Sequence, residues 1–194
     1  MSRPRFSPYL LEMSILRLSL LLFLTLGCLK PIKGQDELDR DLTRKPKAEE
    51  PVREAISSGD LIVVHLWAPW CPNCQAELKS GGWEKLVKDN PQVKFYFVSV
   101  WDDGKDGAAM LTKFGVGDQP NVTILADKGP RSGDTKIKQF AGMPFSWIPT
   151  TWVFKGGDLH YALNYGEVRF DVLQQFLKDS NSEWSHKGEP KLAE

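Results

Sequence analysis

Two cysteines separated by two residues, Cys71 and Cys74, carry the clearest chemistry in this sequence. They follow an apolar run at residues 61–67, whose β-branched residues predict a buried strand, and the residues from Cys71 onward predict the start of a helix. A thiol at a helix N-terminus lies near unpaired N–H groups and the positive end of the helix dipole, which stabilise a thiolate. The second thiol lies one turn along, within reach of the first. The pair therefore predicts thiol–disulfide exchange.

A carboxyl group and an imidazole lie close to the cysteines in the sequence. Glu77 is one turn beyond Cys74, and we expect its carboxylate to reach the dithiol for proton transfer; the alternative is an exposed helix glutamate. His65 stands in the predicted strand, at a position that favours burial beneath Cys74. Two interpretations of His65 remain open, a proton shuttle with a near-neutral pKa and a hydrogen-bonded core histidine.

The composition restricts the classes of function. Of the 194 residues, 41% are hydrophobic and 26% are charged, which is enough for one domain with a substantial core and terminal extensions. The 25 Lys and Arg residues balance 25 Asp and Glu residues, so we expect no nucleic-acid partner, because no basic surface is available to neutralise phosphates. Three cysteines are too few for a disulfide-scaffolded fold.

Other uses of a CxxC pair are weaker alternatives. A zinc site needs further ligands, and the sequence has neither a second CxxC nor clustered histidines, so we predict no metal. Haem attachment needs a histidine directly after the second cysteine, where Gln75 stands. A peroxiredoxin-type peroxidase needs a lone cysteine preceded by Pro and Thr, which is absent here. We expect no organic cofactor.

The N-terminal segment has the features of an export signal. An apolar run at residues 15–26 follows several arginines, is too short to predict a membrane span, and ends just before Cys28. Residues 24–29 resemble a bacterial lipoprotein signal, in which Cys28 becomes the lipid-modified first residue of an anchored protein. A cleaved secretory signal and an uncleaved anchor are the alternatives, and the start could be Met1 or Met13. All of these predict an extracytoplasmic domain, in the periplasm or cell envelope.

The chain divides into four predicted parts: a lipoprotein-type signal peptide (1–27), a polar tether (28–49), a folded domain (50–180) and a polar tail (181–194). Apolar patterns predict helices at 51–58, 71–80, 83–89, 107–114 and 168–178, strands at 61–67, 93–101 and 122–126, a short apolar segment at 137–140, and a hairpin of 147–154 with 159–164. Gly81 and Gly82 predict a kink between the second and third helices. This order predicts an α/β fold with a mixed central sheet flanked by helices.

A proline far from the cysteines completes the pattern. Pro149 opens a strand after an aromatic loop and is a candidate for a cis peptide bond. Taken together, residues 67–74 (WAPWCPNC) and 148–151 (IPTT) resemble the thioredoxin fold. The resemblance covers roughly residues 50–180. It implies that a cis-proline loop packs against the CxxC and offers its backbone to an extended substrate peptide.

One branch of this superfamily is closer than the others. With Glu77 the cysteines form a CxxCxxE pattern, which resembles the TlpA/ResA-like membrane-tethered disulfide reductases. The 74 residues between Cys74 and Pro149 suit that branch, which carries an inserted strand–helix unit relative to thioredoxin. The sequence departs from the branch at His65, where Asn is frequent, and at Lys79, where a proline usually kinks the helix.

The resemblance implies a protein disulfide reductase in which Cys71 attacks and Cys74 resolves the mixed disulfide. The dipeptide between them, Pro-Asn, contains no cation, which favours a reducing pair. The expected substrate-binding residues are Trp70, Trp147, Ile148 and Pro149. The tryptophans expected in the core are Trp67, Trp83, Trp101 and Trp152.

The expected partners are dithiols and disulfides of extracytoplasmic client proteins, for instance during cytochrome c maturation, an upstream membrane electron donor, and the membrane itself through the lipid on Cys28. Two alternatives remain open for the activity. One is a peptide-binding or chaperone module that uses the cis-proline groove, and the other is a disulfide oxidant or isomerase.

Overall fold

The computed structural model describes residues 48–163 and 168–182. The predicted signal peptide (1–27), Cys28, the tether up to residue 47 and the tail from residue 183 lie outside these residues. Within the described ranges, no helix has the length and apolar character needed to cross a membrane.

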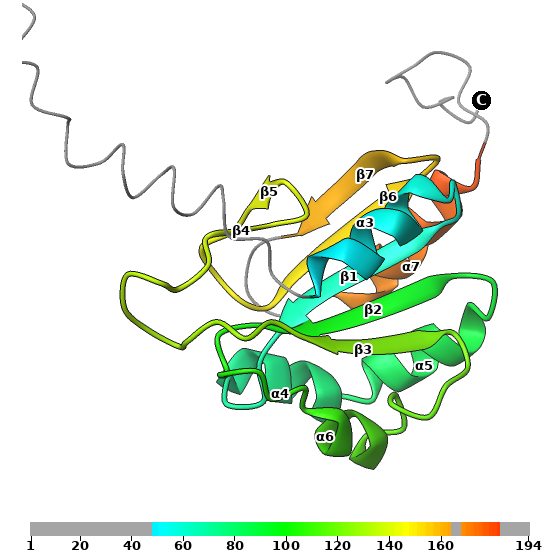
Figure 1. Ribbon diagram of the computed structural model, residues 1–194. Coiled ribbons are helices and arrows are strands. Elements are labelled where there is room, and N and C mark those ends of the chain that lie inside the picture. Colours follow the sequence, from blue (N-terminus) through cyan, green and yellow to red (C-terminus); the bar gives the residue numbers. More distant parts are fainter. Residues whose placement is uncertain (1–47, 164–167, 183–194) are drawn as a thin grey trace, which may run out of the picture. The chain divides into compact units, whose positions relative to one another are not determined.

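A five-stranded mixed sheet lies at the centre of the domain, as the sequence predicts (Figure 1). Its strand order is β3-β2-β1-β6-β7. The neighbours β1, β2 and β3 run parallel, whereas β6 is antiparallel to both β1 and β7. The strands are β1 (Ile62–Trp67), β2 (Lys94–Ser99), β3 (Val122–Ala126), β6 (Thr150–Lys155) and β7 (Asp158–Leu163).

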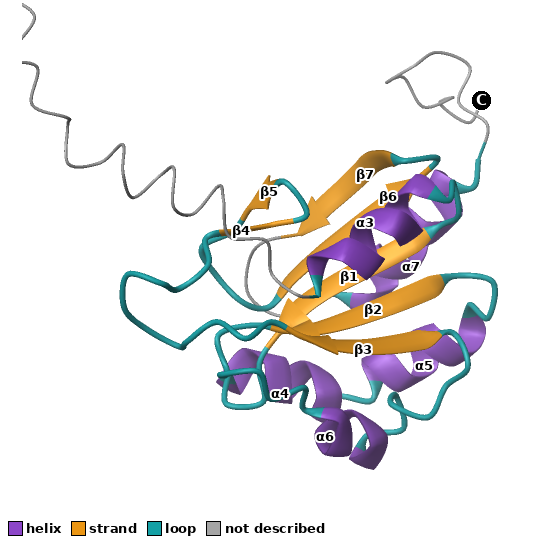
Figure 2. Ribbon diagram, in the orientation of Figure 1, coloured by secondary structure: helices purple, strands orange, loops and turns teal. Residues whose placement is uncertain are grey.

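Helices cover both faces of this sheet, so that the domain has three layers (Figure 2). Four helices pack with one hydrophobic cluster, and a single helix packs with the other, on the opposite face. The first group consists of α4 (Pro72–Lys79), α5 (Gly82–Asp89), α6 (Ala108–Lys113) and α7 (Phe170–Ser180), and the single helix is α3 (Glu49–Ser57).

The central strand β1 is buried along its whole length because both of its faces are covered. Side chains alternate across a strand, so each face receives every second residue. His65 lies on the face of α4 and α5, with its ring centre 4.5 Å from that of Trp83. The residues on the face of α3 are Ile62, Val64 and Leu66. The alternation therefore directs His65 toward the layer that carries the cysteines.

The predicted kink after the CxxC helix is confirmed as a complete break between α4 and α5. Helix α4 ends at Lys79, and Gly81 has φ of 74°, a left-handed conformation that glycine adopts without a steric penalty. A Cβ atom built on Gly82 would lie 2.0 Å from the Phe170 ring. The two glycines thus turn the chain and let α7 approach α5.

Several element boundaries differ from the sequence-based predictions. Helix α3 begins at Glu49 rather than residue 51, and β6 begins at Thr150 rather than residue 147. Where the resemblance implies an inserted strand–helix unit, the chain forms α6 followed by β3, so that the helix precedes the strand. A two-stranded sheet of β4 (Gln139–Phe140) and β5 (Met143–Pro144) was not predicted, because two-residue strands leave no periodic pattern.

Replacing Gly82 with alanine is expected to destabilise the fold by about 1–3 kcal/mol, since the added methyl group displaces the Phe170 ring from Trp83. Urea unfolding followed by tryptophan fluorescence measures the change. The matched control is Lys79→Ala at an exposed helix position, for which we expect a change within about 0.5 kcal/mol. Equal stabilities of the two variants would contradict the close packing of α7 on Gly82.

Candidate active site

The site begins at the N-terminus of α4, where Cys71 is the N-cap residue and Pro72 is the first helical residue. Proline suits this position because its missing N–H would have no helical partner. The Gln75 backbone N–H donates to the Cys71 carbonyl at 3.0 Å, and the Gln75 side chain donates to the Pro69 carbonyl at 2.7 Å. These bonds fix the turn that presents Cys71.

Cys71 and Cys74 are free thiols, and their pKa values are shifted in opposite directions. The side-chain hydrogen bond from Cys74 lowers the pKa of Cys71 to about 6, backbone hydrogen bonds from Cys74 and Asn73 act in the same direction, and burial opposes them. The hydrogen bond to Cys71, together with burial, raises the pKa of Cys74 above its ordinary value. At neutral pH the pair therefore consists of a thiolate at Cys71 and a thiol at Cys74.

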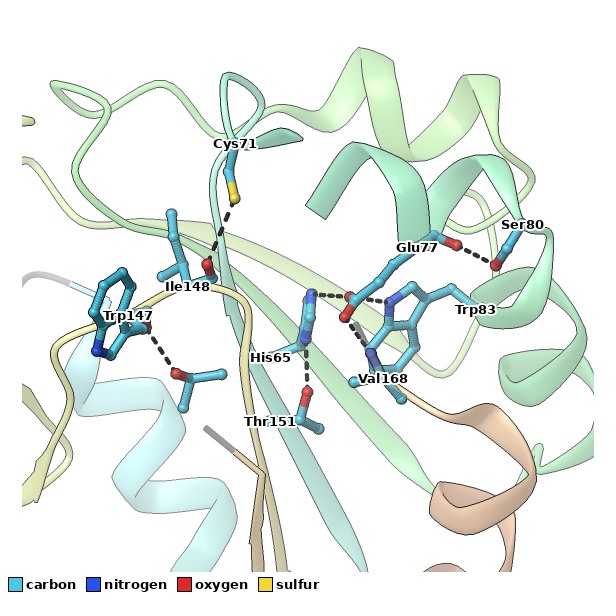
Figure 3. Close-up of polar contacts among 10 residues, drawn as sticks. His65, Cys71, Glu77, Ser80, Trp83, Trp147, Ile148, Thr151 and Val168 are labelled. Atoms are coloured by element: carbon cyan, nitrogen blue, oxygen red, sulfur yellow. Dashed lines mark hydrogen bonds and ion pairs between the residues drawn. The ribbon is translucent and has the colours of Figure 1, made fainter. Parts of the chain in front are cut away.

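The loop before β6 faces the first cysteine. The peptide bond between Ile148 and Pro149 is cis, as predicted. The Cys71 thiol points toward the Ile148 carbonyl oxygen, with Sγ 3.6 Å from it (Figure 3). The Thr150 hydroxyl donates to the Trp147 carbonyl at 2.8 Å, which fixes the backbone on both sides of the proline. Cys71 and the cis-proline, 78 positions apart in the sequence numbering (149 − 71), thus lie side by side.

The two tryptophans expected beside the groove differ in exposure. Trp147 is 70% exposed, which is unusual for so large an apolar side chain. Trp70 is half-buried, and its indole N–H donates to the Trp101 carbonyl at 3.0 Å. The four tryptophans predicted for the core are all buried: Trp67, Trp83, Trp101 and Trp152.

Glu77 is not the exposed helix glutamate of the alternative interpretation, because it is only 1% exposed. The Val168 backbone N–H donates to Oε1 at 2.7 Å, and the Trp83 indole N–H donates to Oε2 at 3.1 Å. His65 Nε2 lies 3.4 Å from Oε2. The carboxylate points into the layer between the helices and the sheet (Figure 3), and its charge is one of the causes that raise the pKa of Cys74.

His65 is 2% exposed, and burial lowers its pKa to about 3. The near-neutral pKa of the shuttle interpretation is therefore not found, because the apolar surroundings disfavour the imidazolium. Its Nδ1 lies 2.9 Å from the Thr151 hydroxyl, and both ring nitrogens consequently have a polar neighbour. These features agree with a hydrogen-bonded core histidine, neutral at physiological pH.

Sequence reasoning did not identify the residues that surround Glu77 and His65. Thr151 and Val168 lie 86 positions from His65 and 91 positions from Glu77, respectively, and only the fold brings them together. Trp83 was assigned to the core for its size, and its hydrogen bond to Glu77 had no sequence signal. A polar residue on an otherwise apolar strand is the one available indication, and it pointed only to His65.

The sequence also matches a known family. A family model described as a thioredoxin-like domain matches residues 48–181, more than half of the 194 residues. The chain therefore belongs to the thioredoxin-like domain family, which confirms the predicted superfamily. No curated protein matches the sequence.

Three solved structures illustrate the similarity. A secreted disulfide oxidoreductase of Mycobacterium tuberculosis, homologous to E. coli DsbE, is 22% identical with a TM-score of 0.46, over 64% of this chain and 84% of that one. A DsbF homologue from Corynebacterium diphtheriae is 21% identical with a TM-score of 0.48, and the match covers 64% of this chain and 74% of that one. A thiol:disulfide interchange protein from Chlorobium tepidum is 16% identical with a TM-score of 0.46, and the match covers 64% of this chain and 81% of that one.

The reduced protein is expected to react with iodoacetamide at Cys71 with a midpoint near pH 6, since only the thiolate reacts and its pKa is about 6. In Cys74→Ala the main hydrogen bond to the thiolate is lost, and the midpoint should rise toward about 8.5, the value of an ordinary thiol. The rate of alkylation as a function of pH measures both values.

The matched control is Cys74→Ser, whose hydroxyl still donates a hydrogen bond and should keep the midpoint closer to that of the unaltered protein. Identical midpoints for the alanine and serine variants would show that the hydrogen bond from Cys74 is not the cause.

Proposed function

We propose that this protein is a thiol–disulfide oxidoreductase that reduces disulfides of extracytoplasmic client proteins through Cys71 and Cys74. The observation that carries the proposal is the unequal thiol pair at the N-terminus of α4, with the lower-pKa thiol next to the cis Ile148–Pro149 bond. A nucleophilic thiolate and a backbone that can align an extended peptide are the two requirements for exchange with a protein disulfide.

The reaction proceeds in two exchanges. The Cys71 thiolate attacks one sulfur of the client disulfide, so that a mixed disulfide forms and the other client sulfur leaves as a thiolate. Cys74 then loses its proton, and its thiolate attacks Cys71 Sγ. The Cys71–Cys74 disulfide forms, the second client sulfur leaves as a thiolate, and two electrons have passed to the client. An upstream donor must return two electrons to the pair.

The second exchange needs a proton acceptor, because the pKa of Cys74 is raised. We assign this task to Glu77, the carboxylate whose charge acts on Cys74. His65 positions it: if the Thr151 hydroxyl donates to Nδ1, the neutral ring carries its proton on Nε2 and donates toward Glu77 Oε2. In this role His65 holds the carboxylate in place and does not itself change charge.

The acidity of Cys71 favours the reducing direction. A thiolate that is strongly stabilised makes the reduced pair stable and the disulfide a strong oxidant, as in enzymes with thiol pKa values near 3.5. The pKa of about 6 at Cys71 is closer to the value of about 7 that is typical of thioredoxin. The Pro-Asn dipeptide adds no cation that would lower it further.

The CxxCxxE pattern and the α6–β3 insertion support membership of the TlpA/ResA-like branch. With the N-terminal signal, they support an extracytoplasmic protein that is anchored through a lipid on Cys28, receives electrons from a membrane donor and reduces client cysteines, for instance during cytochrome c maturation.

Catalysed reduction of insulin by dithiothreitol tests the activity. The unaltered protein is expected to accelerate it, and Cys71→Ser should abolish the acceleration because the attacking thiolate is lost. The reduction potential of the Cys71–Cys74 pair in the unaltered protein should lie closer to about −270 mV, typical of thioredoxin, than to about −120 mV, typical of DsbA. Equal activity of the Cys71→Ser variant would instead favour the peptide-binding module, and a potential near −120 mV would favour an oxidant.

Glu77→Gln is expected to slow the resolution of the mixed disulfide by about 100-fold or more, the usual size of a lost proton-transfer group. It should also lower the pKa of Cys74, since a charge that raises it is removed. Stopped-flow resolution rates across pH and NMR titration of Cys74 measure the two effects. Glu50→Gln on the exposed surface of α3 is the matched control.

His65→Asn separates the two interpretations of the histidine. A positioning role predicts a lower resolution rate with an unchanged pH profile, whereas a shuttle predicts a displaced profile. The assignment of Glu77 has its own contradicting outcome. It would be wrong if Glu77→Gln resolved the mixed disulfide as fast as the unaltered protein and left the pKa of Cys74 unchanged.

A further inference from the structure

Two cations lie over the rings of Trp70 and Trp101, two tryptophans that are joined by a hydrogen bond. The Arg131 Cζ atom is 3.8 Å from the centre of the Trp70 ring, and Lys136 Nζ is 3.5 Å from the centre of the Trp101 ring. Trp70 directly precedes Cys71 in the chain. Cations over indole faces at these distances are attracted by the ring quadrupole. Arg131 is therefore held against the residue that directly precedes Cys71, and Lys136 against the tryptophan whose carbonyl accepts a hydrogen bond from Trp70.

The backbone in this region is built around the two indole rings. Trp101 has φ of 58°, a conformation that is unfavourable for a bulky residue, and its carbonyl accepts the Trp70 indole N–H. The Trp101 indole N–H donates to the Ile137 carbonyl at 2.8 Å. The segment from Arg131 to Ile137 is therefore bound at its C-terminal end to Trp101, and Trp101 is bound in turn to Trp70.

Among the residues that the structure describes, these cations have no partner of opposite charge. In residues 48–163 and 168–182, neither Arg131 nor Lys136 forms an ion pair, and the N–H groups of Arg131 donate no hydrogen bond. Arg131 is exposed, whereas Lys136 is half-buried and its pKa is lowered by burial. A guanidinium that stacks on an indole through its face keeps its N–H edge available for a carboxylate.

We infer that Arg131, supported by Lys136, selects client segments that carry an acidic side chain next to the reacting cysteine. A client peptide that runs along Ile148 and Pro149 to reach Cys71 passes Trp70, and a carboxylate there meets the N–H edge of Arg131. The inference rests on the proposed function, for which it names the substrate class. Arg131 acts on recognition and leaves the chemistry of the thiols unchanged.

Three disulfide peptides that differ only in the residue beside the cysteine, Glu, Gln or Lys, test this inference. Single-turnover reduction by the reduced full-length protein at low salt gives a second-order rate constant for each. We expect the rate constant to fall about threefold from the Glu to the Gln peptide and again about threefold from Gln to Lys, which is the size of effect that partly exposed charge pairs produce. Salt at 0.5 M should diminish these differences. Arg131→Gln should bring the Glu and Gln peptides to equal rates, and Arg131→Lys should retain part of the preference.

Lys178→Gln on the exposed surface of α7 is the charge-matched control and should keep the full preference. Equal rates for the three peptides with the unaltered protein would overturn the inference while leaving the proposed function intact. No reduction of any peptide would overturn the proposed function itself. A shifted alkylation midpoint of Cys71 in Arg131→Gln would overturn the recognition role, because the arginine would then act on the thiolate.

Discussion

The site depends on the burial of one carboxylate. A buried charge is costly unless hydrogen bonds and opposite dipoles surround it, and the groups around Glu77 come from three other parts of the fold. Trp83 belongs to α5, His65 to β1, and Val168 to the segment that leads into α7. Any displacement of these elements would leave the carboxylate unsatisfied. The same arrangement therefore fixes the position of α4, whose first residues hold the dithiol, and places a negative charge near Cys74.

The asymmetry of the two thiols follows from their places in this arrangement. Cys71 receives a hydrogen bond from Cys74 and further bonds from backbone N–H groups at the start of the helix, which all favour its thiolate. The hydrogen bond with Cys71 is the main factor that disfavours ionisation of Cys74, and burial and the charge of Glu77 act in the same direction. Once Cys71 is bound in a mixed disulfide, it no longer offers a thiolate as acceptor. One cause that holds the proton on Cys74 then disappears at the step where that proton must leave.

Local patterns in the sequence predicted those features that local forces determine. The apolar run before Cys71, the proline at the first helical position and the glycine pair predicted β1, the start of α4 and the break after it, because each reflects a preference of neighbouring residues. Pro149 was predicted to be cis from its context. The hydrogen bond from Val168 to Glu77 joins residues 91 positions apart. The contact of Arg131 with Trp70 joins residues 61 positions apart (131 − 70), and no pattern of spacing encodes such contacts. The sequence left two interpretations of His65 open, a proton shuttle and a core histidine, because the pKa depends on complete burial, which a single strand does not define.

The positive and negative charges of the site lie at different depths, and in the proposed mechanism they act at different stages. Arg131 is exposed and can meet a client before any bond forms, so it changes the rate of association and is sensitive to salt. Glu77 is enclosed, and solvent ions screen it far less. In the proposed mechanism Glu77 acts after the mixed disulfide has formed, when Cys74 must ionise. If the two charges were interchanged, a buried cation would lower the pKa of Cys74, while an exposed anion would repel both the acidic client and the thiolate that leaves it. The proposed mechanism therefore has Arg131 attract the substrate at the exposed surface, while the surroundings of Cys74 retain its proton until the first exchange is complete.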